Sequence, residues 1–197
     1  MKNSTHYLFG LGLLNLFILI FIKDSILAWL FLALSFPLGA FSVIPNILDT
    51  YTINLQYERA LKNRIRHPLT HSPWTLPGYF FPLFYIVDIF SDPLLTIIIY
   101  MLALGWFSHL FLDCFNPEGI PLGKKPIYSP HPVKHYSWQT RNTTKTLSLA
   151  RIPFNDPKRN ATFSRFGLFL IALNLADLLH NHFYIISEVI SKVGLYG

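Results

Sequence analysis

The sequence predicts an all-α fold, a polytopic membrane helical bundle of about five transmembrane or re-entrant helices with a loop on its cytoplasmic face. Two observations support this fold class. Of the 197 residues, 52% are hydrophobic and only 13% are charged, a balance outside the usual range of soluble globular proteins. The hydrophobic residues also gather in long runs, and a helix needs about 20 of them to cross the hydrocarbon core of a bilayer. We expect residues 1–197 to form a single membrane-embedded domain.

Two apolar runs near the N-terminus predict a helical hairpin. The first covers residues 7–22 and the second covers residues 25–44. Between them stand Lys23 and Asp24, whose charges favour the membrane surface over its interior. The chain should therefore cross the membrane, turn at these two residues and cross back.

The third and fourth runs predict a second hairpin around a short turn at residues 91–93. Residues 73–90 are apolar but contain three prolines and one glycine, so this helix should be kinked or re-entrant. Its start carries Ser72 as the expected N-cap, followed by Pro73 at the first helical position. Residues 94–115 form the most continuous apolar run and predict a regular span.

A basic loop at residues 116–165 precedes the last predicted helix, at residues 166–186. Within that helix, Asn174, Asp177 and Asn181 follow one another at spacings of three and four, which places them along one face. We interpret this line of polar residues as a buried hydrogen-bonding stripe between helices.

Positive charge is distributed unevenly along the chain. If the five segments alternate, residues 1–6, 45–72 and 116–165 share one side of the membrane. Fourteen of the sixteen Lys and Arg residues fall there, and only Lys23 and Lys192 fall on the other side. By the positive-inside rule the first side is cytoplasmic, which predicts a multi-pass protein of the cell membrane.

The net charge of +6 therefore reflects topology and attraction to membrane lipids, and no nucleic acid is expected as a partner. The basic loop could also hold an amphiphilic, phosphate-bearing substrate. No pattern in the sequence identifies a protein partner.

Polar and ionisable side chains gather at the predicted cytoplasmic ends of the helices. Cys114 is the only cysteine, which excludes a disulfide framework and a multi-cysteine zinc site, so a metal would need histidine and carboxylate ligands. His109 and Asp113 are four residues apart and project from one helix face. The residues that should share this membrane surface are His6, Asn46, Asp49, His67, His71, His109 and Asp113.

Imidazole nitrogen and carboxylate oxygen are ligands that hydrolytic divalent metals accept, and such metals lower the pKa of bound water toward neutrality. The alternative is that histidines near helix ends are ordinary interfacial residues. Co-location favours the metal site, because six of the eight histidines fall on the predicted cytoplasmic side. Ionisable residues at a membrane also commonly have a functional role. The residue pattern alone leaves both interpretations open.

Four segments resemble the signatures of a known family. They read THYLFGLGL at residues 5–13, GAFSVIPN at 39–46, HPLTHS at 67–72 and LGWFSHLFLDCFNPEGI at 104–120. In this order they are similar to the YdjM-like family, a group of inner-membrane proteins regarded as metal-dependent hydrolases. The resemblance covers roughly residues 1–130 and is strongest in the SHLFLD segment with its proline-glycine turn.

The resemblance implies metal-site or catalytic roles for the same residues that the topology gathers. The metal ligands would be His6, His71, His109 and Asp113, and His67 would be catalytic or a further ligand. Beyond the resemblance, we expect Asp49 to be a catalytic residue that handles a proton. The ion would be zinc, with manganese as the alternative.

Two positions depart from the family pattern. Members commonly carry aspartate straight after the proline and again two residues on, whereas this chain has Asn46 and then Asp49, one place late. Asparagine can coordinate through its carbonyl oxygen, but it brings no charge and cannot act as a base. Members also tend to carry His-Arg-Gly where this chain has residues 67–69, and Arg64 or Arg66 could replace that arginine.

A second HPxxH occurs at His131 and His135, where the resemblance fades. These histidines share one face if the segment is helical, but Pro132 and its neighbouring prolines favour a surface loop equally well. Their role stays open.

The function predicted from these observations is a membrane-embedded, metal-dependent hydrolase that acts on an ester or phosphoester of a lipid-like substrate. Two other classes compete with it. A transporter, or a metal-binding membrane protein without catalysis, would need polar residues along a path across the bilayer. In a structural or regulatory scaffold, the basic loop would bind lipid or a partner and the histidines would be incidental.

Overall fold

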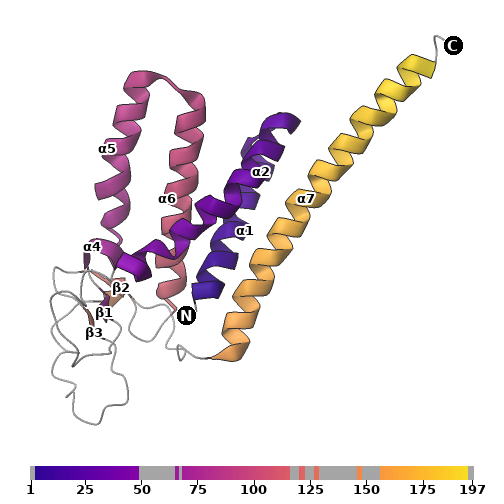
Figure 1. Cartoon of the computed structure of the whole chain (residues 1–197). Coiled ribbons are helices and arrows are strands. Elements are labelled where there is room, and N and C mark those ends of the chain that lie inside the picture. Colours follow the sequence, from indigo (N-terminus) through magenta and orange to yellow (C-terminus); the bar gives the residue numbers. More distant parts are fainter. Residues whose placement is uncertain are drawn as a thin grey trace.

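The computed structural model describes residues 3–48, 65–66, 68–115, 120–122, 127–128, 146–147 and 156–194. Its helices form an all-α bundle (Figure 1). Within the described residues, four helices are long and apolar enough to cross a membrane, and a fifth apolar helix is shorter. The predicted fold class is therefore confirmed.

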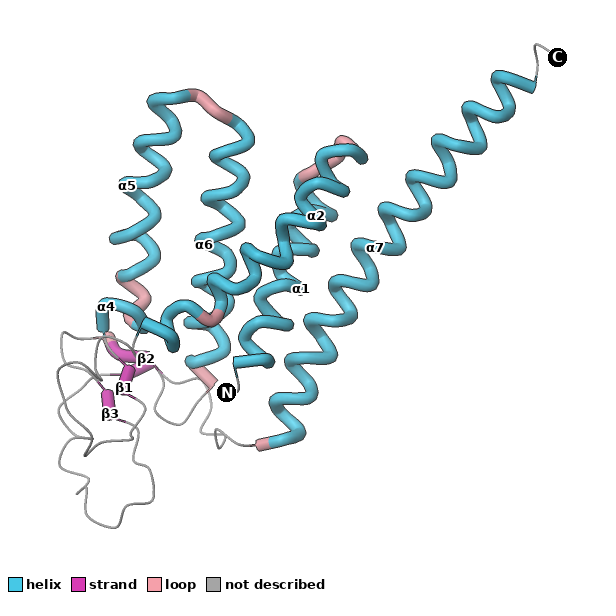
Figure 2. Tube along the Cα trace, in the orientation of Figure 1, coloured by secondary structure: helices cyan, strands magenta, loops and turns pink. Residues whose placement is uncertain are grey.

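Helices α1 (Asn3–Phe21) and α2 (Ser25–Gly39) form the predicted N-terminal hairpin. Asp24 caps α2, because its Oδ1 accepts a hydrogen bond of 2.8 Å from the backbone N–H of Leu27. The connection between the two helices lies at the end of the bundle opposite the N-terminus (Figure 2).

The regular part of α2 ends at Gly39, short of the predicted boundary at residue 44. The chain continues as the 3-10 turn η1 (Ala40–Ser42) and then as a helical segment at residues 44–48. Pro45 has no N–H to donate to a carbonyl four residues earlier, which weakens a regular α-helix through this segment. The tighter turn positions the Ser42 carbonyl beside the candidate site.

Helix α4 (Pro68–His71) is a single turn, and helix α5 (Thr75–Phe90) follows it. Helix α5 is a single apolar helix with Pro82 inside it, shorter than the four helices that are long enough to cross a membrane (Figure 1). The prediction that Ser72 caps this helix is wrong. The Ser72 carbonyl instead closes a turn by accepting hydrogen bonds from the Thr75 amide at 3.0 Å and hydroxyl at 2.6 Å.

Helix α6 (Pro93–Asp113) begins at a strong start signal. Asp92 Oδ1 accepts hydrogen bonds from the backbone N–H groups of Leu94 and Leu95, at 2.9 and 3.1 Å, and Pro93 occupies the first turn. The preceding Ser91 adopts a left-handed conformation with φ of 50°, which ends α5 and reverses the chain.

Helix α7 (Pro157–Gly194) begins nine residues before the predicted start at residue 166, so the basic loop ends at residue 156 and not at 165. Its start repeats the Asp-Pro signal of α6. Asp156 Oδ1 accepts hydrogen bonds from the backbone N–H groups of Lys158 and Arg159, at 2.9 and 3.4 Å. The first turns of α7 contain basic side chains, so a search for apolar runs does not detect the start of this helix.

Two pairs of very short antiparallel strands link the segments between the helices. Strand β1 (Ile65–Arg66) pairs with β3 (Ile127–Tyr128), and β2 (Ile120–Pro121) pairs with β4 (Thr146–Leu147). Each strand has two residues, so these pairs join loop segments and do not add a sheet layer to the bundle.

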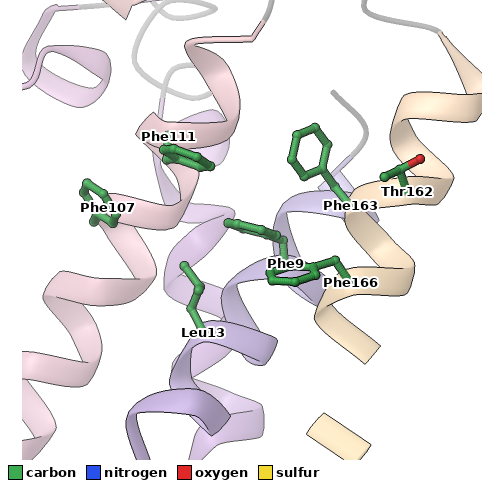
Figure 3. A pocket seen from close by; sticks show the side chains of 7 residues that line it. All are labelled: Phe9, Leu13, Phe107, Phe111, Thr162, Phe163 and Phe166. Carbon is green, nitrogen blue, oxygen red and sulfur yellow. The ribbon is translucent and has the colours of Figure 1, made fainter. Parts of the chain in front are cut away.

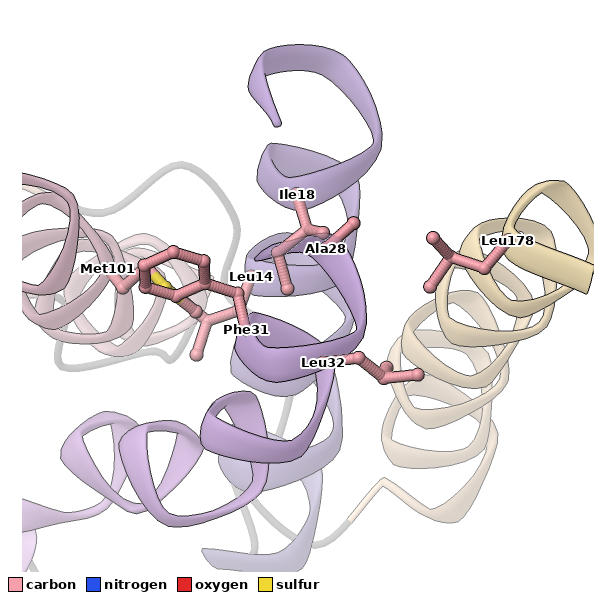
Figure 4. Close-up of a cluster of buried hydrophobic side chains, with 7 residues drawn as sticks. All are labelled: Leu14, Ile18, Ala28, Phe31, Leu32, Met101 and Leu178. Atoms are coloured by element: carbon pink, nitrogen blue, oxygen red, sulfur yellow. The ribbon is translucent and has the colours of Figure 1, made fainter. Parts of the chain in front are cut away.

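Helix α1 is central and packs against α2, α6 and α7. The main apolar cluster joins these helices through residues such as Leu14, Phe31, Met101 and Leu178 (Figure 4). Other large apolar side chains, such as Phe81, are exposed on the outside. An outer surface of this kind faces lipid in a multi-pass membrane protein.

A buried polar contact lies within this apolar core. Asn174 of α7 donates a hydrogen bond of 2.9 Å to Asn15 Oδ1 of α1, and Asn15 donates one of 3.3 Å to Ser35 of α2. Asn174 therefore joins helices as the sequence predicts. Asp177 and Asn181 do not, because both are exposed and bond to each other. The helix turns them away from α1.

Two glycines allow α1 and α7 to approach closely. A Cβ atom added at Gly12 would lie 2.6 Å from the Gly167 Cα atom, and one added at Gly167 would overlap the backbone carbonyl of Leu8. Both obstacles are backbone atoms, which cannot rotate aside. Small residues at a helix crossing give the close van der Waals packing that holds helices together within a bilayer.

We predict that Gly167→Ala destabilises the protein by about 1–3 kcal/mol, because the added methyl group forces α1 and α7 apart. Thermal unfolding of purified protein in detergent would measure the loss. Gly78→Ala is the matched control, since a Cβ at Gly78 meets no atom within 4 Å, and it should stabilise α5 by about 0.5–1 kcal/mol. Equal melting temperatures for Gly167→Ala and the unmodified protein would contradict the proposed role of this crossing.

Candidate metal centre

Three helices bring the candidate ligands to one end of the bundle. His6 lies near the start of α1, His71 is the last residue of α4, and His109 and Asp113 occupy the final turns of α6. The C-terminal end of α6 meets the N-terminal end of α1 because the two helices are antiparallel (Figure 1). The four side chains have relative exposures of 0–1%.

Helix α4 is too short to be stable alone, and hydrogen bonds fix it against the second hairpin. Tyr79 of α5 donates its hydroxyl to the Leu69 carbonyl at 2.6 Å. Trp106 of α6 donates its indole N–H to Thr75 Oγ1 at 3.2 Å. These bonds hold His71 in place beside α6.

The ligand atoms converge on one point. Asp113 Oδ1 lies 3.4 Å from His6 Nε2, and Asp113 Oδ2 lies 3.4 Å from Nε2 of both His71 and His109. The Nε2 atoms of His71 and His109 are 2.9 Å apart. In a tetrahedral zinc site with bonds of about 2.0–2.2 Å, neighbouring ligand atoms lie about 3.3–3.6 Å apart. The three Asp113 contacts lie in that range, with Oδ1 facing His6 and Oδ2 facing His71 and His109, and the His71–His109 contact is shorter.

In His109 and His71, the ring nitrogen Nδ1 faces away from the centre and lies beside a hydrogen-bonding partner. His109 Nδ1 lies 2.7 Å from the Ser42 carbonyl, which can only accept, so Nδ1 carries the proton and Nε2 presents its lone pair to the centre. His71 Nδ1 lies 3.0 Å from the Thr70 hydroxyl, which can donate or accept. The tautomer of His109 is therefore set by the fold, whereas that of His71 can change.

His6 gives the clearest sign that a cation fits this centre. Its ring is fully buried and stacks on the His109 ring at a centroid distance of 4.3 Å. Neither of its ring nitrogens makes a hydrogen bond to a described residue. Buried polar atoms normally have such a partner. A metal ion bound among the ligand atoms would supply one to Nε2.

Asn46 lies at the edge of the same cluster. Its Oδ1 is 3.3 Å from His71 Nε2, while its amide nitrogen donates a hydrogen bond of 3.0 Å to Asn3 Oδ1. The second bond orients the amide so that its oxygen faces the histidines. An oxygen ligand is therefore present at this position, but it carries no charge.

Comparison with known proteins places the chain in a family. The model of the family described as YdjM inner membrane protein matches residues 1–184. The chain belongs to this family. The match extends well beyond the segments that carry the resemblance and includes most of α7. No curated protein and no solved structure matches the chain.

In this YdjM-family protein, His6, His109 and Asp113 form a group that could hold a metal ion, with one ligand atom of each within 4.8 Å of the others. His71 joins the group through its contacts with His109 and Asp113. The structure does not identify the metal. The other predicted site residues, namely Asp49, His67, His131 and His135, lie outside the described residues, so their roles stay predictions.

Some groups that lie beside the candidate metal centre have no sequence pattern that predicts their position. The Ser42 carbonyl is a backbone group, and any residue at that position would provide it. Arg159 is buried and donates to the Phe115 carbonyl at 2.7 Å, where a cation suits the C-terminal end of α6. The neighbouring Asn160 accepts a hydrogen bond of 3.1 Å from Thr5. The Asp-Pro start of α7 is the signal that could have placed these two residues beside the site.

Gly10 allows the η1 turn to reach His109. A Cβ atom added at Gly10 would lie 2.6 Å from Ser42 Cβ and 2.9 Å from Ser108 Oγ. Both serines are fully buried, and each hydroxyl bonds to a carbonyl of its own helix or turn. The three small residues therefore hold the Ser42 carbonyl at the distance that His109 requires.

We predict that replacing His71 and His109 together by alanine removes bound metal from the protein, because half of the ligand set is lost. Elemental analysis of purified protein would measure the metal content. His182→Ala is the control, since His182 is exposed near the other end of α7. Unchanged metal content in the double variant would show that these histidines are incidental and would support the scaffold class.

We predict that Gly10→Ala weakens metal binding by about 10–100-fold, the usual effect of disturbing a group that orients a ligand. Titration with Co²⁺, followed by its visible absorption, would report both affinity and ligand geometry. Gly39→Ala is a neighbouring control, because a Cβ there makes only ordinary contacts of 3.4 Å or more. If Gly10→Ala binds Co²⁺ with unchanged affinity and spectrum, the Ser42 carbonyl does not control His109.

Proposed function

We propose that this protein is a metal-dependent hydrolase of the inner membrane that cleaves an ester or phosphoester of an amphiphilic substrate at the cytoplasmic surface. The proposal rests on the buried cluster of His6, His71, His109 and Asp113 at one end of a membrane-spanning bundle. Imidazole and carboxylate ligands of this kind suit zinc, and manganese is the alternative.

When bound, the metal ion supplies Lewis acidity and lowers the pKa of a coordinated water toward neutrality. The chain must leave room for that water, because four protein ligands would complete a tetrahedral shell. His71 is the candidate ligand best suited to leave the metal, because its ring has other hydrogen-bonding partners while its helix stays in place. Asn46 Oδ1 can accept a hydrogen bond from its Nε2, and Thr70 lies beside its Nδ1.

His71 can also handle a proton during hydrolysis. Its Nε2 faces Asn46 Oδ1, and its Nδ1 faces the Thr70 hydroxyl, which both donates and accepts. A proton taken up on Nε2 would therefore find an acceptor without a rearrangement of the fold. His109 cannot take this role, because the Ser42 carbonyl holds its Nδ1 proton. Asp49 and His67 are further proposed proton carriers.

The cytoplasmic assignment of the site is part of the proposal. Fourteen of the sixteen Lys and Arg residues lie in segments on the side of the membrane that carries the site, given the alternation of the helices. Three of them, Lys158, Arg159 and Arg165, belong to the first turns of α7 at that same end. By the positive-inside rule, this distribution supports a metal centre at the cytoplasmic surface.

The arrangement of the described residues does not favour a transporter. In the membrane interior, Asn15, Ser35 and Asn174 are hydrogen-bonded to one another. Asp177 is exposed on α7 and bonds to Asn181. These groups therefore do not extend the metal centre into a polar path. The scaffold class is tested by the metal content of the variant in which His71 and His109 are both replaced by alanine.

We predict that metal-loaded protein hydrolyses a member of a phospholipid or prenyl-phosphate panel, and that chelation abolishes the activity until metal is restored. Asp113→Asn should lower kcat/KM by roughly 100-fold or more, because it removes a charged ligand. Asp88→Asn, an exposed carboxylate on α5, should leave the rate unchanged. Absence of turnover across both panels, in protein that binds metal tightly, would rule out the proposed reaction.

A further inference from the structure

A groove of about 510 Å³ lies between α1, α6 and α7 at the same end of the bundle as the metal centre (Figure 3). Five phenylalanines, one leucine and Thr162 line it. The Thr162 hydroxyl is directed back to its own helix, where it donates to the Lys158 carbonyl at 2.9 Å. The lining is therefore apolar, and its volume falls within the range of about 300–1,000 Å³ that is usual for ligand pockets.

Aromatic contacts hold the walls of this groove in place. Phe9 of α1 stacks on Phe111 of α6 at 5.9 Å and meets Phe163 of α7 edge-on at 5.7 Å. The glycine contact between α1 and α7 fixes the spacing of two of the three walls. These side chains come from three helices and point toward a common space (Figure 3). The groove is thus a built feature of the packing.

The groove and the metal centre share two helices. Phe9 follows His6 by three residues and lies on the same face of α1. Phe111 lies two residues from both His109 and Asp113, so the helical period directs it to the other side of α6. A molecule in the groove would therefore contact the same helical turns that carry three of the metal-site residues.

Positive charge flanks the surface end of the groove. Lys158 precedes Thr162 by four residues, so it lies on the same face of α7 one turn closer to the helix start. Lys158 is exposed, and so is Arg165, which is adjacent to the lining residue Phe166. None of the lining residues is acidic. A ligand that combines a hydrocarbon chain with an anionic head matches this pattern.

We infer that the groove binds the hydrocarbon chain of an anionic amphiphile, with its head group beside Lys158. The inference rests on the proposed function, for which it identifies the substrate as a lipid-like anion that approaches sideways from the membrane. The apolar lining excludes a polar chain, because no lining side chain offers it a free hydrogen-bonding group. The head group would then lie at the membrane surface, at the level of the metal centre.

The test is photolabelling of full-length protein in nanodiscs of phosphatidylcholine. The probe is hexadecyl phosphate with a diazirine in the middle of its chain, and the labelled positions are mapped by peptide mass spectrometry. We expect labels to concentrate in α1, α6 and α7 near Phe9, Phe111 and Phe163, and to be displaced by unlabelled hexadecyl phosphate. Labelling spread evenly over the lipid-facing surface, including exposed residues of α5, would overturn the inference.

Two groove-filling variants sharpen the test. Leu13→Trp places a large side chain in the groove, and Thr162→Trp does the same from an exposed position where misfolding is less of a risk. Each should reduce the displaceable labelling several-fold. Leu83→Trp on the exposed face of α5 is the matched control and should have no effect. Undiminished labelling in a folded groove-filled variant would contradict the site.

Charge recognition is tested separately. Lys158→Gln should raise the hexadecyl phosphate concentration for half-maximal labelling by about fivefold, as expected for one lysine near a membrane surface. It should not change labelling by the matching diazirine alcohol, which has no charge. Lys23→Gln, at the opposite membrane surface, is the control. Equal effects of Lys158→Gln on both probes would refute the role of charge.

Photolabelling does not depend on turnover or on metal. Labelling of the groove in protein that hydrolyses nothing would retain the binding site and reject the hydrolase. Hydrolysis of an amphiphile by protein whose groove is not labelled would retain the hydrolase and reject the groove. The two proposals can therefore fail independently.

Discussion

The convergence of Asp113 with three histidine Nε2 atoms is the contact on which the rest of the structure depends. A carboxylate that is 1% exposed is costly to bury unless positive charge or hydrogen bonds compensate for it. The Nε2 atoms of three histidines lie 3.4 Å from its oxygens, and a divalent cation among them would attract the carboxylate and use the imidazole lone pairs. The helices that deliver these groups must meet at this point.

The packing of α1 follows from that requirement. Glycines stand at the places where this helix comes closest to its neighbours, Gly10 against η1 and α6, and Gly12 against α7. Close packing at both positions leaves little freedom for His6 or for the Ser42 carbonyl. The rigid part of the centre is therefore formed by α1, η1 and α6. Helix α4 is a single turn, and His71 is the ligand with the most alternative partners.

The sequence predicts the helices well because apolar length and helix-start signals are local properties. The apolar run predicted for α6 begins one residue after its true start at Pro93, whereas α7 begins nine residues before its predicted start because its basic first turns resemble a loop. The candidate group of His6, His109 and Asp113 is predictable because histidine and aspartate are rare in apolar runs. Ser72 shows the limit, since its side chain suggests a cap while the carbonyl closes a turn that tertiary contacts select.

The candidate metal centre lies at the end of a membrane-spanning bundle, where it borders both polar and apolar surroundings. On one side of α6, His109 and Asp113 face the polar cluster, and on the other, Phe107 and Phe111 face an apolar groove. Alternate faces of one helix thus suit the two parts of an amphiphile. A soluble ester could reach the metal without the groove, and a lipid without an anionic head would gain nothing from Lys158. Under the proposed function, only an anionic amphiphile would use both surfaces, so the groove would restrict the substrate class more than the candidate metal ligands do.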